Sequence, residues 1–269
     1  MSMDLAILST HTPRMCHRDR VPPFQEPLVH ALDQASGQLS DAEIDVLVTI
    51  SCHWMSTFDH YVDATPVHEG LLTAEECPDL ISQVPYRYRG DRDLGIALAE
   101  AGRAAGIPVI SFEDPAYVLD YGTVVPLRYL DPREELAVVP LSVCWSADLD
   151  ESYQWGQVIG QTLKKSGRRA AFVASGALSH NLVRGPERWP TTMEMALDQK
   201  FIELLQDQKL EEVRQMLPSF AQAAKVESGG RHVAVLLGVL SEIAAYHAEY
   251  LGYAQSSGSG NPIMVFSRR

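Results

Sequence analysis

DVLVTISCH, residues 45–53, is a run of apolar and β-branched residues that ends at a histidine. Two other stretches repeat this pattern, since DLAILSTH ends at His11 and AAFVASGALSH ends at His180. Such runs predict buried β-strands. The carboxyl ends of strands in open α/β sheets form one rim where ligands bind, so we expect His11, His53 and His180 to lie at that rim. Three imidazoles at one rim indicate a metal site or an acid/base site.

The rest of the chain alternates between strand-like and helix-like patterns. The predicted strands are residues 5–9, 45–51, 108–112, 136–143, 170–174 and 262–266. The predicted helices are residues 93–105, a stripe over residues 155–163, and residues 193–224 and 231–249 in the last third. This alternation is typical of a sheet with helices on both sides. We therefore predict one α/β domain over residues 1–269, in which helices cover both faces of a largely parallel or mixed central sheet.

Composition and charge narrow the class of ligand. Hydrophobic residues make up 46% of the chain and charged residues 21%, which is the mixture of a soluble globular protein. The formal net charge of -13 would repel both the phosphates of nucleic acids and an anionic membrane surface. We therefore expect a small molecule as the ligand, and neither a nucleic acid nor a membrane as a partner.

The cysteines and the hydropathy pattern bear on the cellular compartment. Cys16, Cys52, Cys77 and Cys144 show no CxxC spacing, and the chain is too long and too poor in cysteine for a disulfide framework. The first residues lack the basic segment of a signal peptide, and no stretch approaches the ~18 apolar residues of a membrane span. We expect reduced thiols and a soluble, cytoplasmic protein.

Two of the strand-end histidines suggest metal binding. His11 and His53 directly follow predicted strands, so both side chains should enter the same crevice. Iron(II) and zinc both accept imidazole, and a set of two histidines and one carboxylate leaves coordination positions open. Glu227 is the candidate carboxylate, because KVESGGRH is a polar, glycine-containing corner between helical stretches. Spacing alone does not select it among 35 acidic residues, and its other interpretation is a solvated helix end.

Three further residues have two interpretations each. His180 follows a strand and a turn of small residues, which suits a general acid/base beside a metal and equally a third ligand. His60, in FDHYVD, could reach the same site or lie on the surface of a strand. Tyr121, in LDYGTVVPL, could donate a proton into the crevice or pack in a turn. The residues by themselves do not separate these roles.

The glycines of SSGSGNP, residues 256–262, do not predict a dinucleotide site. They follow no predicted strand and open no predicted helix, as a dinucleotide-binding loop would. The sequence also has no GxSxG elbow of the kind that carries a hydrolase nucleophile.

Several motifs, taken in order, resemble those of the class III extradiol ring-cleavage dioxygenases. The resemblance rests on STHTPRM (9–15), CHWMSTFDHYVD (52–63), VPYRYRGDRDLGIALAEAGRAAGI (84–107), LDYGTVVPLRYL (119–130), VASGALSH (173–180), MLPSFAQAAKVESG (216–229) and SSGSGNPIMVF (256–266). Together these stretches span nearly the whole chain, and their order is more specific than any one of them.

The resemblance implies an Fe(II) enzyme that uses O2 to open a catechol ring beside its two hydroxyls. It implies that His11, His53 and Glu227 hold the iron and that His180 is the acid/base residue. The similarity is greatest to members that cleave 3,4-dihydroxyphenylacetate at the 2,3 bond to a muconic semialdehyde. We also expect a homo-oligomer.

The resemblance leaves the substrate and part of the site open. It implies that Tyr121 lies beside the iron ligands and that His60 lies near the substrate. Arg14, Arg231 and His60 are the candidates for binding a substituent of the ring. Another catechol or a 2-aminophenol therefore remains an alternative substrate. A catalytically silent binding or scaffold protein of the same fold and a zinc hydrolase are the alternative functions.

Overall fold

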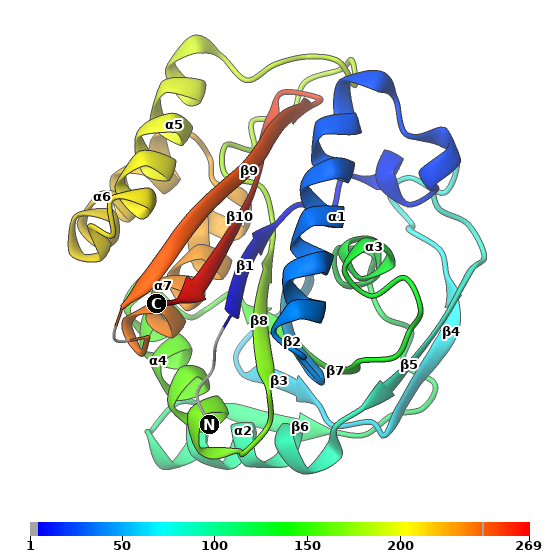
Figure 1. Ribbon diagram of the computed structural model, residues 1–269, viewed down its shortest axis with the longest axis vertical. Coiled ribbons are helices and arrows are strands. Elements are labelled where there is room, and N and C mark those ends of the chain that lie inside the picture. The colour runs from blue at the N-terminus through cyan, green and yellow to red at the C-terminus, as the bar shows by residue number, and fades with distance from the viewer. Residues whose placement is uncertain (1–4, 244) are drawn as a thin grey trace.

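The computed structural model describes residues 5–243 and 245–269, whose strands form a ten-stranded sheet (Figure 1). The strands are β1 (Leu5–Ser9), β2 (Val46–Ser56), β3 (His60–Asp63), β4 (Val67–Leu72), β5 (Val84–Gly90), β6 (Val109–Phe112), β7 (Ala137–Cys144), β8 (Ala170–Ser175), β9 (Tyr246–Ser256) and β10 (Ser259–Arg268). The α-helices are α1 (Glu26–Asp41), α2 (Arg92–Ala104), α3 (Tyr121–Leu130), α4 (Leu149–Lys165), α5 (Thr192–Gln206), α6 (Leu210–Ala223) and α7 (Arg231–Ser241). Among these helices, none has both the length and the apolar character needed to cross a membrane.

Four parallel strands, β7, β2, β8 and β1, lie side by side at the centre of the sheet. The full order is β4-β5-β7-β2-β8-β1-β10-β9, and β3 pairs with both β6 and β7. β10 pairs antiparallel with β1 and with β9, so the sheet is mixed. Every residue of β1, β7 and β8 is buried, as the apolar runs in the sequence predicted. The predicted α/β fold with a mixed central sheet is confirmed.

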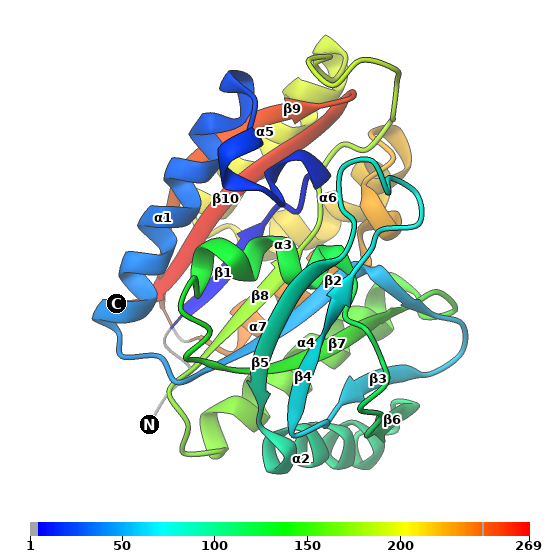
Figure 2. The same cartoon turned by 90° about the vertical axis from the view of Figure 1, so that its right-hand side faces the viewer.

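Two hydrophobic cores lie on opposite faces of the sheet. Ala6 and Leu8 of β1 belong to one core, and Leu5 and Ile7 belong to the other, because successive side chains of a strand point to opposite faces. Helices α2, α4, α5, α6 and α7 close the first core, and α1 and α3 close the second (Figure 2). With both faces packed, the ends of the central strands are held in fixed positions.

Residues 193–224 form two helices rather than the single helical stretch that was predicted. α5 ends at Gln206 and α6 begins at Leu210. Gln208, between them, has a φ of 59°, a left-handed conformation that a continuous right-handed helix cannot contain. The apolar spacing continues on both sides of this residue, so the pattern did not reveal the break.

The predicted helix over residues 231–249 is wrong beyond Ser241. α7 ends there, and β9 begins at Tyr246. Tyr246 and Ala248 are buried while His247 between them is exposed, which is the two-residue period of a strand. The last third of the chain therefore has two strands rather than one.

The two late strands form the long hairpin β9–β10 (Figure 1). Gly258 lies in its turn with a φ of 86°, a conformation that glycine adopts without strain. The glycines of residues 256–262 therefore do follow a strand, contrary to the prediction, although the next element is another strand and not a helix. The hairpin of β4 and β5 was also not predicted.

Helices α4 and α7 approach each other closely at Gly156 and Gly238. A β-carbon on Gly238 would lie 2.0 Å from the carbonyl oxygen of Tyr153, and one on Gly156 would lie 2.0 Å from that of Val235. We expect Gly238→Ala to lower the free energy of unfolding by about 2 kcal/mol or more, because a side chain cannot rotate away from a backbone clash. Urea unfolding of the purified variant measures this loss.

Gly37→Ala in α1 is the matched control. Gly37 is exposed, and a β-carbon there would meet no atom within 4 Å. Alanine favours the helix over glycine by about 0.5–1 kcal/mol, so this variant should gain stability. Equal effects of the two substitutions would contradict the close packing of α4 against α7.

Candidate metal centre

Three side chains from distant parts of the chain meet at the carboxyl ends of the central strands. His11 lies just after β1, His53 lies in the last part of β2, and Glu227 begins the short 3-10 helix η4 (Glu227–Gly230). One donor atom from each lies within 4.8 Å of the other two, and His11 and Glu227 are buried. Their spacing allows all three residues to bind one metal ion.

A bulge in β2 positions His53. The strand continues to Ser56 rather than ending at Ser51 as predicted. Its pairing with β7 shifts between Ser51 and Met55, so the residues between them are extra on the β2 side. Bulges change the direction in which side chains point, and His53 is one of these extra residues.

A left-handed turn positions Glu227. Ser228, Gly229 and Gly230 have φ values of 51°, 63° and 82°, so the chain reverses directly after the glutamate. Two of the three residues are glycines, which adopt this conformation at little cost. The turn brings the carboxylate against the end of β8, where Oε2 accepts a hydrogen bond of 2.6 Å from the backbone N–H of Ala177.

Each histidine of the cluster is held through Nδ1. His11 Nδ1 lies 2.9 Å from Ser175 Oγ, and that hydroxyl donates to the carbonyl oxygen of Gly122 at 2.5 Å. His11 Nδ1 must therefore carry the proton that Ser175 accepts. His53 Nδ1 lies 3.1 Å from Oε1 of Glu76, and an ionised carboxylate can only accept. When each ring is neutral with its proton on Nδ1, Nε2 carries the lone pair that metal binding requires.

The free oxygen of Glu227 faces both Nε2 atoms. Glu227 Oε1 lies 3.3 Å from His11 Nε2 and 3.4 Å from His53 Nε2. Burial alone would raise the pKa of Glu227, but the charge of His11, the hydrogen bonds of His11 and His53, and the charge of His180 hold it well below its usual range. Burial likewise opposes protonation of His53, yet the bond to Glu227 leaves the His53 pKa raised. An ionised carboxylate with two imidazole nitrogens is a donor set that fits Fe(II) or zinc.

His180 lies at the edge of this cluster. Its Nε2 is 3.8 Å from Glu227 Oε1, and about 29% of its side chain is exposed. Burial lowers the pKa of His180, and the neighbouring charges of His11 and His53 also lower it, against the opposite effect of Glu227. A neutral imidazole beside the donors and open to solvent can accept a proton from a bound ligand.

Tyr121 lies against the two histidines from the start of α3. Its ring centroid is 3.9 Å from that of His53 and 5.6 Å from that of His11. Burial raises the pKa of Tyr121, and the carboxylates of Glu76 and Glu227 raise it further. The hydroxyl therefore keeps its proton at neutral pH and can act as a hydrogen-bond donor.

His60 has its contacts elsewhere in the fold. It begins β3, is only 1% exposed, and its Nε2 lies 3.2 Å from Oε1 of Glu151 on α4. Its ring also packs on Trp155 of the same helix. The surface position considered for His60 is wrong, and its hydrogen bond and ring contact are with α4 rather than with the histidine cluster.

Burial lowers the pKa of His60 to about 4 despite the partly exposed Glu151 beside it. An unfolded histidine binds its proton near pH 6.5, so unfolding takes up a proton between these values and stability falls as the pH falls through this range. We expect a loss of about 3 kcal/mol from this group. His60→Gln should show a correspondingly smaller loss of stability between pH 7 and pH 4 in urea unfolding. The exposed His247→Gln is the control, and equal pH slopes for wild type and His60→Gln would contradict the prediction.

The two arginines considered for substrate binding are placed differently. Arg231 donates to the carbonyl oxygens of Trp145, Ala147 and Ser228, and its guanidinium lies 4.9 Å from the Trp145 ring centroid. These bonds tie the turn after Glu227 to the segment after β7 and use three of the five guanidinium N–H donors. Arg14 lies half-buried in the 3-10 helix Pro13–Met15, just after His11.

Sequence reasoning missed the residues that hold the histidines. Ser175 is the last residue of β8, and a polar residue at the end of an apolar run was the available signal. Glu76 lies in the loop between β4 and β5, and nothing in its surroundings, TAEECPD, marks it. Its contact with His53 follows from a hairpin that the sequence did not predict.

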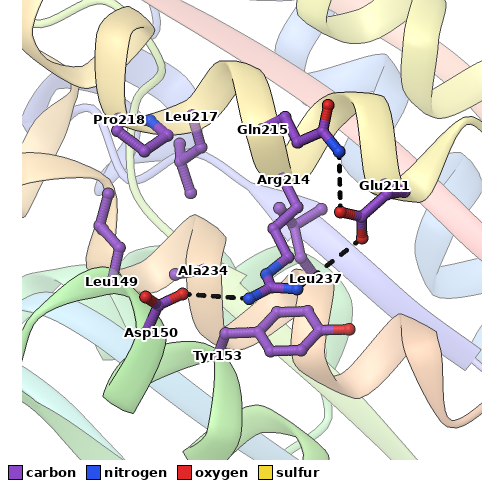
Figure 3. A pocket seen from close by; sticks show the side chains of 10 residues that line it. All are labelled: Leu149, Asp150, Tyr153, Glu211, Arg214, Gln215, Leu217, Pro218, Ala234 and Leu237. Atoms are coloured by element: carbon purple, nitrogen blue, oxygen red, sulfur yellow. Dashed lines mark hydrogen bonds and ion pairs between the residues drawn. The ribbon is translucent and has the colours of Figure 1, made fainter.

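A hollow of about 240 Å³ lies between α4, α6 and α7, and neither the histidines nor Glu227 of the cluster line it (Figure 3). Arg214 extends over the ring of Tyr153 at 4.6 Å and pairs with Asp150 and Glu211. Because the charged side chains of this hollow pair with one another, we assign it no ligand.

Comparisons with known proteins identify the family of this chain. The sequence matches the catalytic LigB subunit of aromatic ring-opening dioxygenase over residues 5–264. The 3,4-dihydroxyphenylacetate 2,3-dioxygenase of Escherichia coli is 25% identical over an alignment of 214 positions, which covers 77% of this chain and 78% of that protein. The 2-aminophenol 1,6-dioxygenase beta subunit of Pseudomonas sp is 28% identical over an alignment of 289 positions, which covers 97% of this chain and 92% of that protein.

A solved structure has a similar fold. The crystal structure of the uncharacterised protein JW3007 of Escherichia coli K12 aligns with a TM-score of 0.71 at 19% identity, over 98% of this chain and 99% of that one. At this identity the likeness shows the fold alone. The family match, by contrast, extends from β1 into β10 and includes all of the residues of the cluster. The chain therefore belongs to the family of the catalytic LigB subunit of aromatic ring-opening dioxygenase.

Proposed function

We propose that this protein is an Fe(II)-dependent extradiol dioxygenase, with residues 1–269 as one catalytic domain and 3,4-dihydroxyphenylacetate as its substrate. The observation that carries the proposal is the cluster of His11, His53 and Glu227, whose donor atoms face one another in a chain of the LigB family. The printed activity of the Escherichia coli relative supports the choice of substrate. The reaction would place both atoms of O2 in a ring-opened semialdehyde, so it needs no external reductant.

The side chains of the site have separate roles in this proposal. His11, His53 and Glu227 would hold Fe(II), which supplies a Lewis acid for the catechol oxygens and the one-electron chemistry that O2 requires. Ser175 and Glu76 keep Nε2 of each histidine free of a proton. The fixed donors also remove much of the entropy cost of bringing two reactants together.

His180 would transfer a proton beside the iron, and Tyr121 would donate a hydrogen bond there. His180, neutral and partly exposed, would take a proton from a catechol hydroxyl at Nε2 and return it later to the opening ring. Tyr121 keeps its proton and would donate a hydrogen bond to an oxygen of the substrate. His60 was expected near the substrate, but its contacts with α4 give it no part in this proposal.

Oxygen uptake with a panel of aromatic substrates tests the proposal. Protein purified without oxygen and reconstituted with Fe(II) should hold about one iron per chain and convert 3,4-dihydroxyphenylacetate to a yellow product with one O2 consumed per turnover. Iron-loaded protein that consumes no O2 with any catechol or aminophenol would overturn it. Saturable catechol binding without iron would indicate a silent binding protein, and activity with zinc that needs no O2 would indicate a hydrolase.

2-Aminophenol is the second candidate substrate. A relative that is similar over 97% of this chain is a 2-aminophenol 1,6-dioxygenase beta subunit. The ratio of kcat/KM for 2-aminophenol and 3,4-dihydroxyphenylacetate, measured on one preparation, decides between them. A higher value for the aminophenol would correct the substrate and leave the metal chemistry in place.

We also propose a homo-oligomer as the assembled form. Light scattering during gel filtration should give a mass that is a multiple of the 29.7 kDa chain. A monomer that is fully active would contradict this part of the proposal. An inactive chain that becomes active only with a second protein would indicate an assembly of unlike subunits.

A further inference from the structure

A buried carboxylate on α5 lies next to the segment that carries His180, and the proposed reaction gives it no role. Asp198 has no exposed surface. Its Oδ1 accepts a 3.0 Å hydrogen bond from the backbone N–H of Ser179, and its Oδ2 accepts bonds of 2.6 Å from the hydroxyls of Ser179 and Tyr253. Among the described residues, no lysine, arginine or histidine forms an ion pair with it within 4.0 Å. The three hydrogen bonds are therefore what compensates its burial.

Burial raises the pKa of Asp198 to about 6, against the lowering effect of its bonds to Ser179 and Tyr253. At neutral pH the group is ionised, so all three bonds are to a charged acceptor. Such bonds are shorter and roughly twice as strong as those between neutral groups. Burying a charged carboxylate costs folding free energy that an apolar side chain of the same size would not cost. We therefore expect Asp198 to have a role other than packing.

Backbone bonds transmit the position of Ser179 to its neighbour His180. Gly260 of β10 donates to the carbonyl oxygen of Ser179 at 2.8 Å and accepts from the N–H of Leu178 at 3.0 Å. The N–H of His180 donates to the carbonyl oxygen of Ala224 at 3.1 Å. The carbonyl oxygen of Ser179 and the N–H of His180 belong to one peptide group, and both are hydrogen-bonded. The direction of the His180 side chain therefore depends on the position of Ser179.

Strand β10 packs closely against Asp198 and Ser179 at Gly260. A β-carbon on Gly260 would lie 2.0 Å from Asp198 Oδ2, 2.1 Å from the Tyr253 hydroxyl and 2.7 Å from Ser179 Oγ. The ring of Trp189 stacks on that of Tyr253, with the centroids 6.2 Å apart and the planes at 15°. The Asp198 carboxylate and the hydroxyls of Tyr253 and Ser179 therefore pack directly against the backbone of β10.

We propose that Asp198 is a positioning residue for proton transfer. Its hydrogen bonds to Ser179 orient the His180 imidazole toward the substrate that binds beside Glu227. This role rests on the proposed dioxygenase function, in which His180 exchanges the proton. Asp198 itself touches neither metal nor substrate. Its carboxylate sets the geometry of the residue that does.

A double-mutant cycle with His180 tests the role. Asp198→Asn keeps the size of the side chain but cannot accept all three bonds, and we expect kcat to fall roughly 10- to 100-fold with KM and iron content little changed, since small misplacements of a reacting group have effects of this size. In a His180→Phe background the same substitution should change kcat by less than about 3-fold, because the group it positions is gone. Equal fold losses in both backgrounds would overturn the proposal.

Two further variants separate positioning from general damage. Glu194→Gln is the matched control, because Glu194 is a buried acid on the same helix that caps its start at Thr191 and does not contact Ser179. It should keep its kcat. Tyr253→Phe removes one of the three hydrogen bonds to Asp198 and keeps the ring against Trp189. It should lower kcat only a few-fold. If Asp198→Asn does not fold, the kcat of Tyr253→Phe in the wild-type and His180→Phe backgrounds tests the positioning role in its place. If Glu194→Gln lost as much kcat as Asp198→Asn and Tyr253→Phe do, the positioning role of Asp198 would be overturned.

Hydrogen exchange gives a measurement that does not depend on turnover. The N–H of Ser179 donates to Asp198, so a peptide covering residues 176–183 should exchange faster in Asp198→Asn than in wild type, while peptides of α1 remain unchanged. Unchanged exchange in this peptide would overturn the positioning role. Absence of O2 uptake by wild-type protein would instead overturn the dioxygenase proposal, and with it the functional half of this inference.

Discussion

Glu227→Ala should abolish both iron binding and turnover. The substitution removes the carboxylate of the cluster and with it the negative charge that faces Nε2 of His11 and of His53. Loss of a residue that merely orients a ligand costs about 10- to 100-fold in metal affinity, so loss of a ligand should cost at least ~100-fold. Iron per chain after reconstitution and dialysis, together with O2 uptake, measures the effect.

Glu242→Ala is the control for this substitution. Glu242 lies at the end of α7, where it pairs with Lys164 and Gln161 of α4 rather than with the histidines. The variant should keep its iron and its activity. Full iron occupancy in Glu227→Ala would show that the ligand set is wrong. His11→Ala and His53→Ala should behave as Glu227→Ala does.

His180→Phe should keep its iron and still bind catechol, but turn over on the order of 100-fold or more slowly. This is the usual scale for the loss of a positioned proton-transfer group. Phenylalanine keeps a flat aromatic ring at this position but has no nitrogen that can bind a proton, so binding and chemistry can be measured separately. Iron content, catechol binding and the rate of O2 uptake give the three readouts.

His247→Phe, at an exposed position of β9, is the control for a general effect of the substitution. It should be fully active. Loss of iron in His180→Phe would make His180 a ligand, and near-normal turnover would make it a structural residue.

The strand pattern was sufficient to predict which histidines come together. His11, His53 and His180 each follow an apolar run, and parallel strands end at the same rim, so their proximity follows from the alternation alone. The structure does place all three around Glu227. The direction of His53 could not be predicted, because it depends on a bulge that no residue pattern in β2 marks.

Glu227 could not be selected from the sequence by spacing. Its position depends on three consecutive left-handed residues, and only the two glycines hinted at them. Glu76 depends on the β4–β5 hairpin, which was not predicted at all. The late strand β9 was missed because an apolar helix precedes it directly and its two-residue period is clear only at Tyr246 and Ala248.

The position of β1 inside the sheet affects the order of events during synthesis. β1 pairs with β8 on one side and with β10 on the other, so the strand that leads to His11 has no neighbour while most of the chain is still on the ribosome. Such non-local pairings form slowly and leave unpaired edges exposed in the meantime. His11 and Glu227 are 216 positions apart, so a nascent chain cannot assemble the three donors until translation is almost finished. We therefore expect iron to bind only after the fold is complete. Chains that end before β10 should bind no iron and should aggregate.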